Sequence, residues 1–396
     1  MSEDDQQQND GPRVSRRALL GIAGVAGGGV LLGAGGYVAT RDDSGTPAAA
    51  ASVSPFHGDH QAGVATKQQK YLHFAAYDLA ATSRDDLRGL MRSWTQVAAE
   101  LTAGGSHGID DPQNLTITFG FGTSLFDGRF GLAAQRPPAL ADIPAFKFDK
   151  LDPAVSGGDL CVQVCSDDRV VAMQAASKVQ ATAGSIAAVR WAQEGFLRDP
   201  LPGETTTRNL FGFKDGTNNL DPSDDAKMHS NVWVNAMDGP SWMTNGTYLV
   251  SRRILMQINE FLPEPVNIQE MNIGRQKGSG APIGQKNEFE PVDPSKELPD
   301  SHIMMANQRR ATSEAERILR RGYNFTTGYD DLLSSPTGGL FFIAIQRDPR
   351  RQFVSIQTRL STRDRLTKYI VHQSGALFAV PPGVKPGGYV GETLLA

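Results

Sequence analysis

The chain has 396 residues, a formal net charge of -4 and only two cysteines. This charge balance, without a stripe of Lys and Arg interleaved with aromatic residues, argues against a nucleic-acid-binding protein. Two cysteines cannot complete a zinc or iron–sulfur site by themselves. The length and composition instead predict a globular protein with room for two domains.

The sequence of residues 1–51 predicts an export signal followed by a linker. We therefore do not expect this segment to be part of the fold. Arg16 and Arg17 lie in the run SRRALL, a twin-arginine pattern, and a weakly hydrophobic stretch rich in Gly and Ala follows as far as Ala39. Small residues at positions 48–51 supply an A-x-A cleavage pattern. The alternative is an uncleaved anchor, because the stretch approaches the length of a bilayer crossing. The pattern predicts recognition by the twin-arginine translocase and a protein that is extracellular, periplasmic or attached to the cell envelope.

The first half of the remaining chain, residues 52–205, predicts the element order β-α-β-β-α-β. The expected elements are a strand at 71–79, a helix that begins after Ser83, strands at 115–121 and 160–164, a helix at 169–182 and a strand at 186–191. Cys161 and Cys165 lie on one face of an extended segment but too far apart for a disulfide, so we expect free thiols in a core.

The second half, residues 206–396, predicts a similar order interrupted by insertions. The expected elements are a strand at 247–258, a helical segment at 313–321, a strand at 339–346, helices at 351–360 and 363–369, and a strand at 376–380. Residues 259–299 have no sustained period, which indicates a long irregular insertion of the kind that often serves function. Together the halves predict an α+β protein with two ferredoxin-like domains, built on antiparallel sheets with helices on their faces.

Three short segments of the second half contain the polar side chains best suited to a reaction. GFKDGT places Asp215 on a turn, where Gly216 lets the backbone approach a ligand closely. DSHIMMAN contains His302, and LRRGYNF contains Arg320 and Arg321 at the end of the predicted helical segment. A carboxylate, an imidazole and a guanidinium that faces developing negative charge are the groups that haem-based peroxide chemistry requires.

Each of these residues also has an ordinary structural explanation. Asp-Gly is a common turn dipeptide, and two arginines at a helix end are favoured by the helix dipole. The histidines that compete for a ligand role are His57, His60, His73, His107, His229, His302 and His372. His372 is the main rival to His302, because it follows a predicted helix and precedes the last strand. A calcium loop in DGTNNLDPSDD is a further alternative, but Leu220 and Ala226 stand where the EF-hand pattern needs Gly and Glu.

GFKDGT, SHIMMAN and LRRGY, together with GLFFIAIQRDP and the ending LFAVPPG, resemble the dye-decolourising (DyP-type) peroxidase family. The resemblance is closest to its exported, EfeB-like deferrochelatase/peroxidase branch, and it extends from PFHGDHQAG near residue 55 to the C-terminus. It implies two ferredoxin-like domains with one haem b per chain, bound in the C-terminal domain. It also implies a haem peroxidase that uses hydrogen peroxide to oxidise dyes, phenols or other reductants through a ferryl intermediate. The alternative within this branch is a deferrochelatase that handles haem for an iron-uptake system, and a homodimer is compatible with either.

The resemblance also assigns roles to individual residues. His302 corresponds to the iron ligand, Asp215 to the distal acid–base residue and Arg320 to the distal arginine. Asp364 falls where many family members place an acidic residue that accepts the proton of the proximal imidazole. The implied haem contacts also include Gly216, Thr217, Asn218, Asn307, Gln308 and Arg309, with Arg309 as the propionate partner.

The chain departs from the family pattern at two positions. Met304 stands where relatives often have Arg, and Gln308 stands where Pro is usual. A haem between domains does not admit bulky dyes, so the resemblance implies that large substrates are oxidised through surface Trp or Tyr residues. The candidates are Trp191, Trp233, Trp242, Tyr323 and Tyr329.

Overall fold

The computed structural model describes residues 52–80, 83–330 and 335–396. The predicted export signal and linker, residues 1–51, lie outside these ranges. None of the described helices is long and apolar enough to cross a membrane. The α+β class predicted from the sequence is confirmed, because helices accompany strands that pair in antiparallel fashion throughout the described chain.

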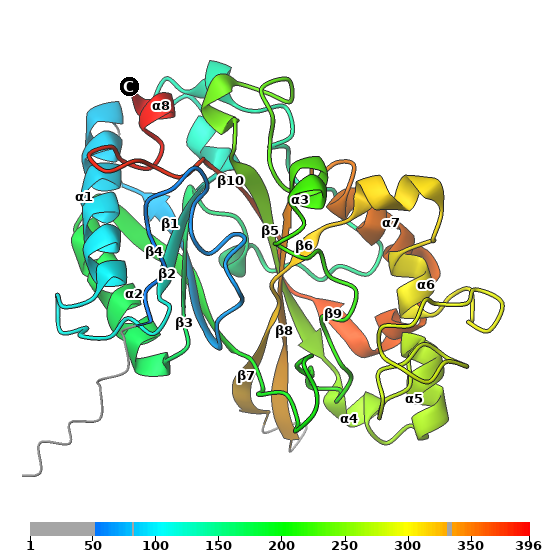
Figure 1. The fold of residues 1–396 in the computed structure, drawn as a ribbon. Coiled ribbons are helices and arrows are strands. Elements are labelled where there is room, and N and C mark those ends of the chain that lie inside the picture. The colour runs from blue at the N-terminus through cyan, green and yellow to red at the C-terminus, as the bar shows by residue number, and fades with distance from the viewer. Residues whose placement is uncertain (1–51, 81–82, 331–334) are drawn as a thin grey trace, which may run out of the picture. The chain divides into compact units, whose positions relative to one another are not determined.

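The first half forms a four-stranded sheet with two helices packed on it. Its elements are β1 (Tyr71–Leu79), α1 (Arg84–Ala103), β2 (Thr116–Gly122), β3 (Leu160–Ser166), α2 (Arg169–Ala183) and β4 (Ala187–Phe196), with the strand order β4-β1-β3-β2. Every predicted element of this half is present, although some ends differ. α1 begins where the Ser83 side chain accepts the N–H of Asp86, as the sequence predicts. In Figure 1, α1 and α2 lie together on the outer side of this sheet.

The second half contains strands in a corresponding order. Its strands are β5 (Thr247–Met256), β6 (Leu319–Arg320), β7 (Tyr323–Asp330), β8 (Ser335–Gln346), β9 (Ile370–His372) and β10 (Ala376–Val380), with the order β7-β8-β5-β10. The short strand β6 pairs with β8 beyond the end of β7. The short strand β9 pairs with β5 beyond the end of β10. The helices are α3 (Asp225–Asn231), α4 (Ile258–Phe261), α5 (Val266–Ile273), α6 (His302–Ala306), α7 (Phe353–Arg363) and α8 (Glu392–Leu395), with 3-10 helices at Ala311–Glu316 and Arg365–Tyr369.

The two sets of strands join edge to edge into one closed barrel of eight strands. β4 pairs with β7 at Phe196 and Asn324, and β2 pairs with β10 at Phe121 and Ala379. β5 pairs with β8, which completes the ring. The predicted pair of sheets did not include this closure, because edge pairing depends on residues that are far apart in the chain. Closure satisfies the backbone groups of sheet edges that would otherwise be open to another chain.

The barrel interior is filled by side chains from both halves. The ring of Phe74 on β1 lies 5.5 Å from that of Trp191 on β4 and 5.3 Å from that of Phe341 on β8. Cys161 and Cys165 are buried in this core as free thiols, which confirms the prediction, and burial raises the pKa of both. A second core lies outside the first-half strands, where α1 and α2 cover them.

One predicted element of the second half is wrong, and several observed elements had no predicted counterpart. Residues 313–321 do not form one helical segment, because the 3-10 helix ends at Glu316 and Arg320 lies in β6, paired with Ala344 of β8. Pairing with a neighbouring strand overrides the local helical pattern at this point. The strand β7 had no predicted counterpart. The insertion at 259–299 contains α5 and most of α4 and is otherwise irregular.

Candidate functional site

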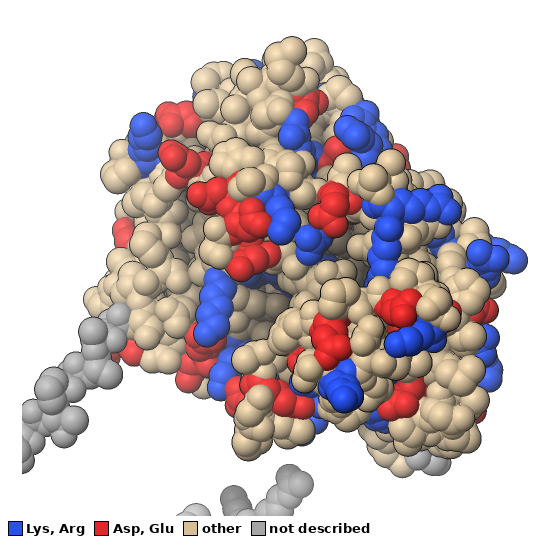
Figure 2. Space-filling model, turned by 45° about the vertical axis from the view of Figure 1, so that its right-hand side comes forward, with Lys and Arg blue, Asp and Glu red and all other residues tan. Residues whose placement is uncertain are grey.

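A large cavity lies between the strands β5 and β8 and the helices α6 and α7. The space open to the centres of water molecules is about 260 Å³. Residues of the GFKDGT turn, Arg275 beyond α5 and the chain around Arg320 complete the walls. Figure 2 shows a hollow in the middle of one face of the molecule, with acidic and basic side chains around it.

His302 begins α6 and lines the cavity. Its Nδ1 lies 2.7 Å from Oδ2 of Asp364, a buried carboxylate that follows α7. Oδ1 of Asp364 accepts the N–H of Leu366 at 2.9 Å, which fixes the orientation of the carboxylate. Burial opposes a charge on His302, but the nearby Asp364 outweighs it and raises the pKa of the imidazole. The contact leaves Nε2 as the ring nitrogen that is available to bind a metal.

Asp215 lies in the GFKDGT turn on the barrel side of the cavity. Its Oδ1 accepts a hydrogen bond from Nη1 of Arg320 at 3.0 Å, and its Oδ2 accepts one from Nδ2 of Asn209 at 3.3 Å. The N–H of Asp215 donates to the carbonyl of Thr207 at 2.9 Å and closes the turn. Gly216 follows with a φ of 147°, a conformation that L side chains rarely adopt. The motif therefore holds a carboxylate and a guanidinium side by side at the cavity wall.

Asn219, which no sequence pattern revealed, holds the backbone of Arg320. Its Oδ1 accepts the N–H of Arg320 and its Nδ2 donates to the carbonyl of Arg320, both at 2.8 Å. The resemblance pointed instead to the neighbouring Asn218, which lines the cavity. The bridge from Asn219 spans 101 residues of sequence, so no local pattern could have indicated it.

Two guanidinium groups that form no ion pair within the described chain lie at another part of the cavity. Arg309 uses Nη1 to bind the carbonyl of Ile303 at 2.9 Å, and Arg275 uses Nη1 to bind the carbonyls of Gly280 at 2.7 Å and Glu288 at 3.0 Å. Burial lowers the pKa of both groups, and the charge of Arg275 lowers the pKa of Arg309 further. A buried cation, Arg275, and a half-buried one, Arg309, near each other favour an anionic ligand. Arg309 was predicted, whereas Arg275 was not.

Nearly all residues predicted to contact a cofactor line this cavity. They are Asp215, Gly216, Thr217, Asn218, His302, Asn307, Arg309, Arg320 and Asp364. Gln308, which was also predicted, does not line it. Oδ1 of Asn307 accepts the N–H of Arg309 at 2.8 Å, and this turn leaves Gln308 outside the lining. Met304, where the family often has Arg, accepts a contact from Nη1 of Arg309 at its sulfur at 3.4 Å.

His372 lies in the same cavity but in different surroundings. Its Nδ1 is 3.9 Å from Oδ1 of Asp149, too far for a hydrogen bond, and Arg252 already binds that carboxylate. Burial, and then the charge of Arg252, lower the pKa of His372 to about 3. Of the two histidines, His302 alone has a carboxylate bonded to its second ring nitrogen, the arrangement that orients an imidazole for a metal.

The other candidates lie away from the cavity lining. These histidines are His57, His60, His73, His107 and His229. Asp221 and Asp224 accept the N–H groups of Ser223 and Lys227, so the acidic stretch forms a turn and caps α3. No group of three or more His, Cys, Asp and Glu residues in the described ranges could hold a metal ion. Among the Trp and Tyr candidates, Tyr329 is exposed and the other four are buried.

A smaller cavity adjoins the large one behind the acidic turn. The volume open to the centre of a water molecule is about 40 Å³, which is enough to hold a water molecule. Asp215 and Arg320 line both cavities, as do Asn209 and Phe342. A small polar molecule in this smaller cavity would therefore contact Asp215 and Arg320 as well.

Two family models match the chain. The model described as Dyp-type peroxidase, N-terminal, matches residues 61–197, and the one described as Dyp-type peroxidase, C-terminal, matches residues 206–385. The deferrochelatase of Escherichia coli O157:H7 is 36% identical over 410 residues, which cover 96% of each chain. The deferrochelatase of Escherichia coli (strain K12) is 35% identical over 415 residues, which cover 96% of this chain and 97% of its own.

The chain is also similar to solved structures. DtpA from Streptomyces lividans, in an oxyferrous/water mixed complex, shares 38% identity with a TM-score of 0.81, over 87% of this chain and 98% of its own. A DyP-type peroxidase from Cellulomonas bogoriensis shares 36% identity with a TM-score of 0.81, over the same 87% and 98%. The family matches include the segments of the second half that line the cavity.

Proposed function

The chain belongs to the Dyp-type peroxidase family, and we propose that Asp215, Arg320 and His302 perform its reaction in the large cavity. The protein is a haem-dependent enzyme that uses hydrogen peroxide to oxidise an electron donor. Haem supplies the iron at which the oxygen–oxygen bond of peroxide breaks, and it stores the oxidising equivalents that the donor removes. The chain supplies the groups that hold haem and move protons.

The cavity offers suitable groups for each part of a haem. His302 would bind the iron through Nε2, which its contact with Asp364 leaves available. Arg275 and Arg309 would hold the two propionates, which supply the negative charge that these two cations need. Apolar side chains of the lining, Phe213 and Leu340 among them, would contact the porphyrin ring.

Asp215 would act as the general acid–base group. Its carboxylate would accept a proton from one oxygen of hydrogen peroxide and return it to the other oxygen, which leaves as water. Arg320 remains charged and stabilises the negative charge that develops as the bond breaks. The 3.0 Å contact between them supports a joint role, because the guanidinium holds the carboxylate in one orientation.

Asp364 would control how strongly His302 donates electrons to the iron. By holding the proton on Nδ1, the carboxylate makes the imidazole more basic at Nε2. The side chain of Asp364 is only 1% exposed, so water does not compete for this hydrogen bond. The family resemblance placed an acidic residue at this position, and the 2.7 Å contact supports it.

The observation that supports the proposal most is that the Arg320–Asp215 and His302–Asp364 pairs line the same cavity. The variants Asp215→Asn and Arg320→Leu should still bind haem and show a Soret band. Each should react with peroxide at least about 100-fold more slowly than the wild type in stopped-flow spectroscopy. Wild-type rates in both variants would remove the assigned roles of Asp215 and Arg320.

A deferrochelatase activity is the second candidate, because the Escherichia coli relatives at 35–36% identity have that name. Such a protein would release iron from haem for an iron-uptake system and leave the porphyrin ring intact. Incubation of the protein with haem under anaerobic conditions tests this function. Porphyrin fluorescence that appears without added peroxide supports iron release, whereas unchanged haem rejects it.

We also propose two ferredoxin-like domains, residues 52–205 and 206–396, with haem in the second. The strand orders β4-β1-β3-β2 and β10-β5-β8-β7 support this division, because in each of these orders the strand that comes fourth along the chain is followed by the first, the third and the second. The separate family matches of the two halves also support it. Export by the twin-arginine route rests on the SRRALL pattern. Replacement of Arg16 and Arg17 by Lys should retain the protein in the cytoplasm, which cell fractionation can measure.

A further inference from the structure

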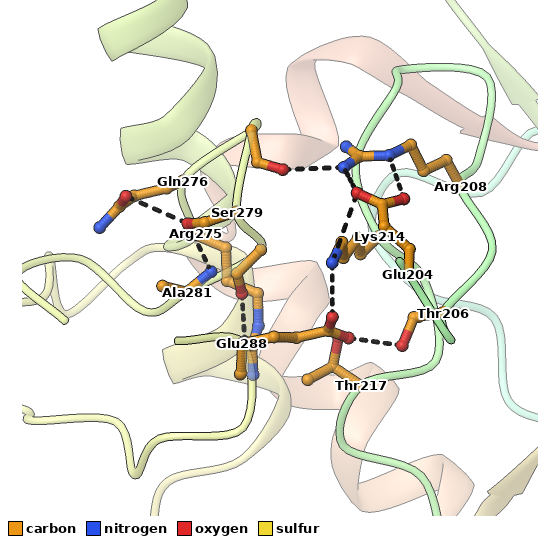
Figure 3. A network of polar contacts seen from close by, with 12 residues as sticks. Glu204, Thr206, Arg208, Lys214, Thr217, Arg275, Gln276, Ser279, Ala281 and Glu288 are labelled. Atoms are coloured by element: carbon orange, nitrogen blue, oxygen red, sulfur yellow. Dashed lines mark hydrogen bonds and ion pairs between the residues drawn. The ribbon is translucent and has the colours of Figure 1, made fainter. Parts of the chain in front are cut away.

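A buried carboxylate, Glu288, holds the turn that contains Asp215. Its Oε2 lies 2.6 Å from Nζ of Lys214, and its Oε1 accepts hydrogen bonds from the hydroxyls of Thr206 and of Thr217, the latter at 2.8 Å. The three donors flank or belong to the GFKDGT motif, whereas Glu288 belongs to the long insertion. Figure 3 shows these side chains converging on the carboxylate. We call Glu288, Lys214, Thr206 and Thr217 the Glu288 clamp.

The clamp is shielded from water, and its charges are paired. The side chains of Lys214 and Glu288 are each 7% exposed, and Lys214 also lies 3.5 Å from Oε1 of Glu204. Burial alone would raise the pKa of Glu288, but the bonds from Lys214 and the two hydroxyls outweigh it and lower the pKa. Removal of the charge of Glu288 would take from the buried Lys214 its nearest partner, which is more costly than losing a surface ion pair.

The insertion also approaches the motif closely through its backbone. Gly280 has a φ of 75°, and a Cβ at this position would lie 2.6 Å from Cδ of Lys214. Arg208 makes a further link, because its guanidinium donates to the carbonyls of Lys277 at 2.6 Å and Gly278 at 2.8 Å. The insertion and the acidic turn are therefore joined at several points and should order together.

The same insertion brings Arg275 to the cavity. Nη1 of Arg275 donates to the backbone carbonyl of Glu288 at 3.0 Å, so the two residues are directly bonded. Burial acts most strongly against the charge of Arg275 and Arg320 adds repulsion, whereas the carboxylates of Glu288 and Glu297 offset these effects only in part, so the pKa of Arg275 stays lowered. A further anion beside Arg275 would add to this offset. An anion bound at Arg275 would thus stabilise the chain around Glu288, and through the clamp it would stabilise the turn of Asp215.

We propose that Glu288 is a positioning residue that makes the placement of Asp215 depend on an anionic group bound at Arg275. The identity of that group rests on the proposed function, where it is a carboxylate of haem. The carboxylate that moves protons is then held more firmly when the carboxylate end of the cofactor is seated. The clamp and its coupling to Arg275 can be tested separately.

The first experiment uses the haem-free protein and measures hydrogen exchange of the segment 206–217 by mass spectrometry. Glu288→Gln removes the charge of the clamp and should speed this exchange by about tenfold or more, because charge-assisted hydrogen bonds are lost. Glu290→Gln is the matched control, since Glu290 lies in the same insertion and accepts the N–H of Asn287 at 2.9 Å. Its exchange should equal that of the wild type.

A second pair of variants separates positioning from general loss of structure. Thr206→Val removes one hydroxyl of the clamp and leaves its charges, and it should speed the exchange a few-fold. Thr206→Ser keeps the hydroxyl and should restore wild-type exchange. In every variant, exchange in β1 should stay unchanged if the barrel is intact. Wild-type exchange at 206–217 in both Glu288→Gln and Thr206→Val would overturn the clamp.

The second experiment adds iron-free protoporphyrin IX or its dimethyl ester, so that no peroxide chemistry is involved. Protoporphyrin IX should slow exchange at 206–217 in the wild type by about tenfold, and the ester should not, because it has no anion for Arg275. In Glu288→Gln, protoporphyrin IX and its dimethyl ester should have the same effect on exchange at 206–217. Equal protection by acid and ester in the wild type would overturn the coupling. Failure of the Asp215→Asn test would instead concern only the role of Asp215 in peroxide chemistry.

Discussion

The two halves of the barrel have corresponding strand orders, but different structures cover their strands. In the first half, α1 packs directly on the sheet, and the fully buried Trp94 donates from its indole to the carbonyl of Val179 on α2 at 3.0 Å. In the second half, α6 and α7 are separated from β5 and β8 by the large cavity, and Phe342 faces that space. One sheet face is filled and the other is open, so the same strand order can support a core or a binding site.

The charges around the cavity help to explain why the second face stays open. In the described ranges the buried Arg275 and the half-buried Arg309 have no ion-pair partner, and Asp215 has one partner, Arg320. Apolar packing against these groups would leave charges buried without compensation. The insertion at 259–299 and the clamp at Glu288 hold the groups in position instead.

The largest effect is expected at the cavity, from His302→Ala. This variant should lose the native ligation spectrum of bound haem entirely, because no other described residue that lines the cavity supplies a carboxylate-bonded imidazole. His372→Ala is the matched control, since His372 lines the same cavity, and it should keep the spectrum. Ultraviolet–visible titration with haem measures both. Loss of the native spectrum in His372→Ala alone would transfer the ligand role to His372.

On the filled face, Trp94→Ala should lower the free energy of unfolding by about 3–5 kcal/mol, because it creates a void in a packed core. Ile356→Ala, at the open cavity, should cost less than about 1.5 kcal/mol, because its side chain borders space that already exists. Urea unfolding of the two haem-free variants checks the contrast. Equal losses would show that the two faces do not differ in packing.

His372 should make the haem-free protein less stable in acid. Its pKa is about 3 in the fold and about 6.5 in the unfolded chain, so the unfolded state binds the proton first. The contribution of the neutral His372 side chain to the free energy of unfolding is fully present above pH 6.5 and is lost as pH falls from 6.5 towards 3. Between neutral pH and about pH 4, the free energy of unfolding should therefore fall by about 2–4 kcal/mol less in His372→Asn than in the wild type.

Unfolding curves at several pH values measure this difference, which isolates His372 from other titrating groups. His229→Asn, at an exposed position, is the matched control for the replacement of a histidine by asparagine. An acid-sensitivity of His372→Asn equal to that of wild type would contradict the low pKa.

The smallest effect is expected from Asn219→Ala, which removes both hydrogen bonds to the backbone of Arg320. Haem should still bind, because Asn219 does not line the large cavity. The reaction with peroxide should slow by about tenfold, since a misplaced Arg320 stabilises the developing charge less well. A wild-type rate would show that the pairing of β6 with β8 positions Arg320 without this bridge.

Local patterns in the sequence were sufficient for much of the fold. Apolar alternation and the Ser83 cap predicted the elements of the first half, because strand and helix periods repeat over a few residues. The same reasoning failed at Arg320, where a helical pattern gave way to pairing with β8. The residues of the candidate site came from the order of three motifs matched to a family, since spacing alone left His302 and His372 as rivals.

By itself, the sequence predicted the element order of the first half, the buried thiols and several residues that line the cavity, among them Asp215, His302 and Arg320. Only the tertiary structure decided that the strands close into one barrel, that Arg275 joins Arg309, and that Asn219 and Glu288 hold the acidic turn and its arginine. The reason is distance along the chain. Glu288 meets Lys214 over 74 residues and Asn219 meets Arg320 over 101, and such contacts leave no trace in a local pattern.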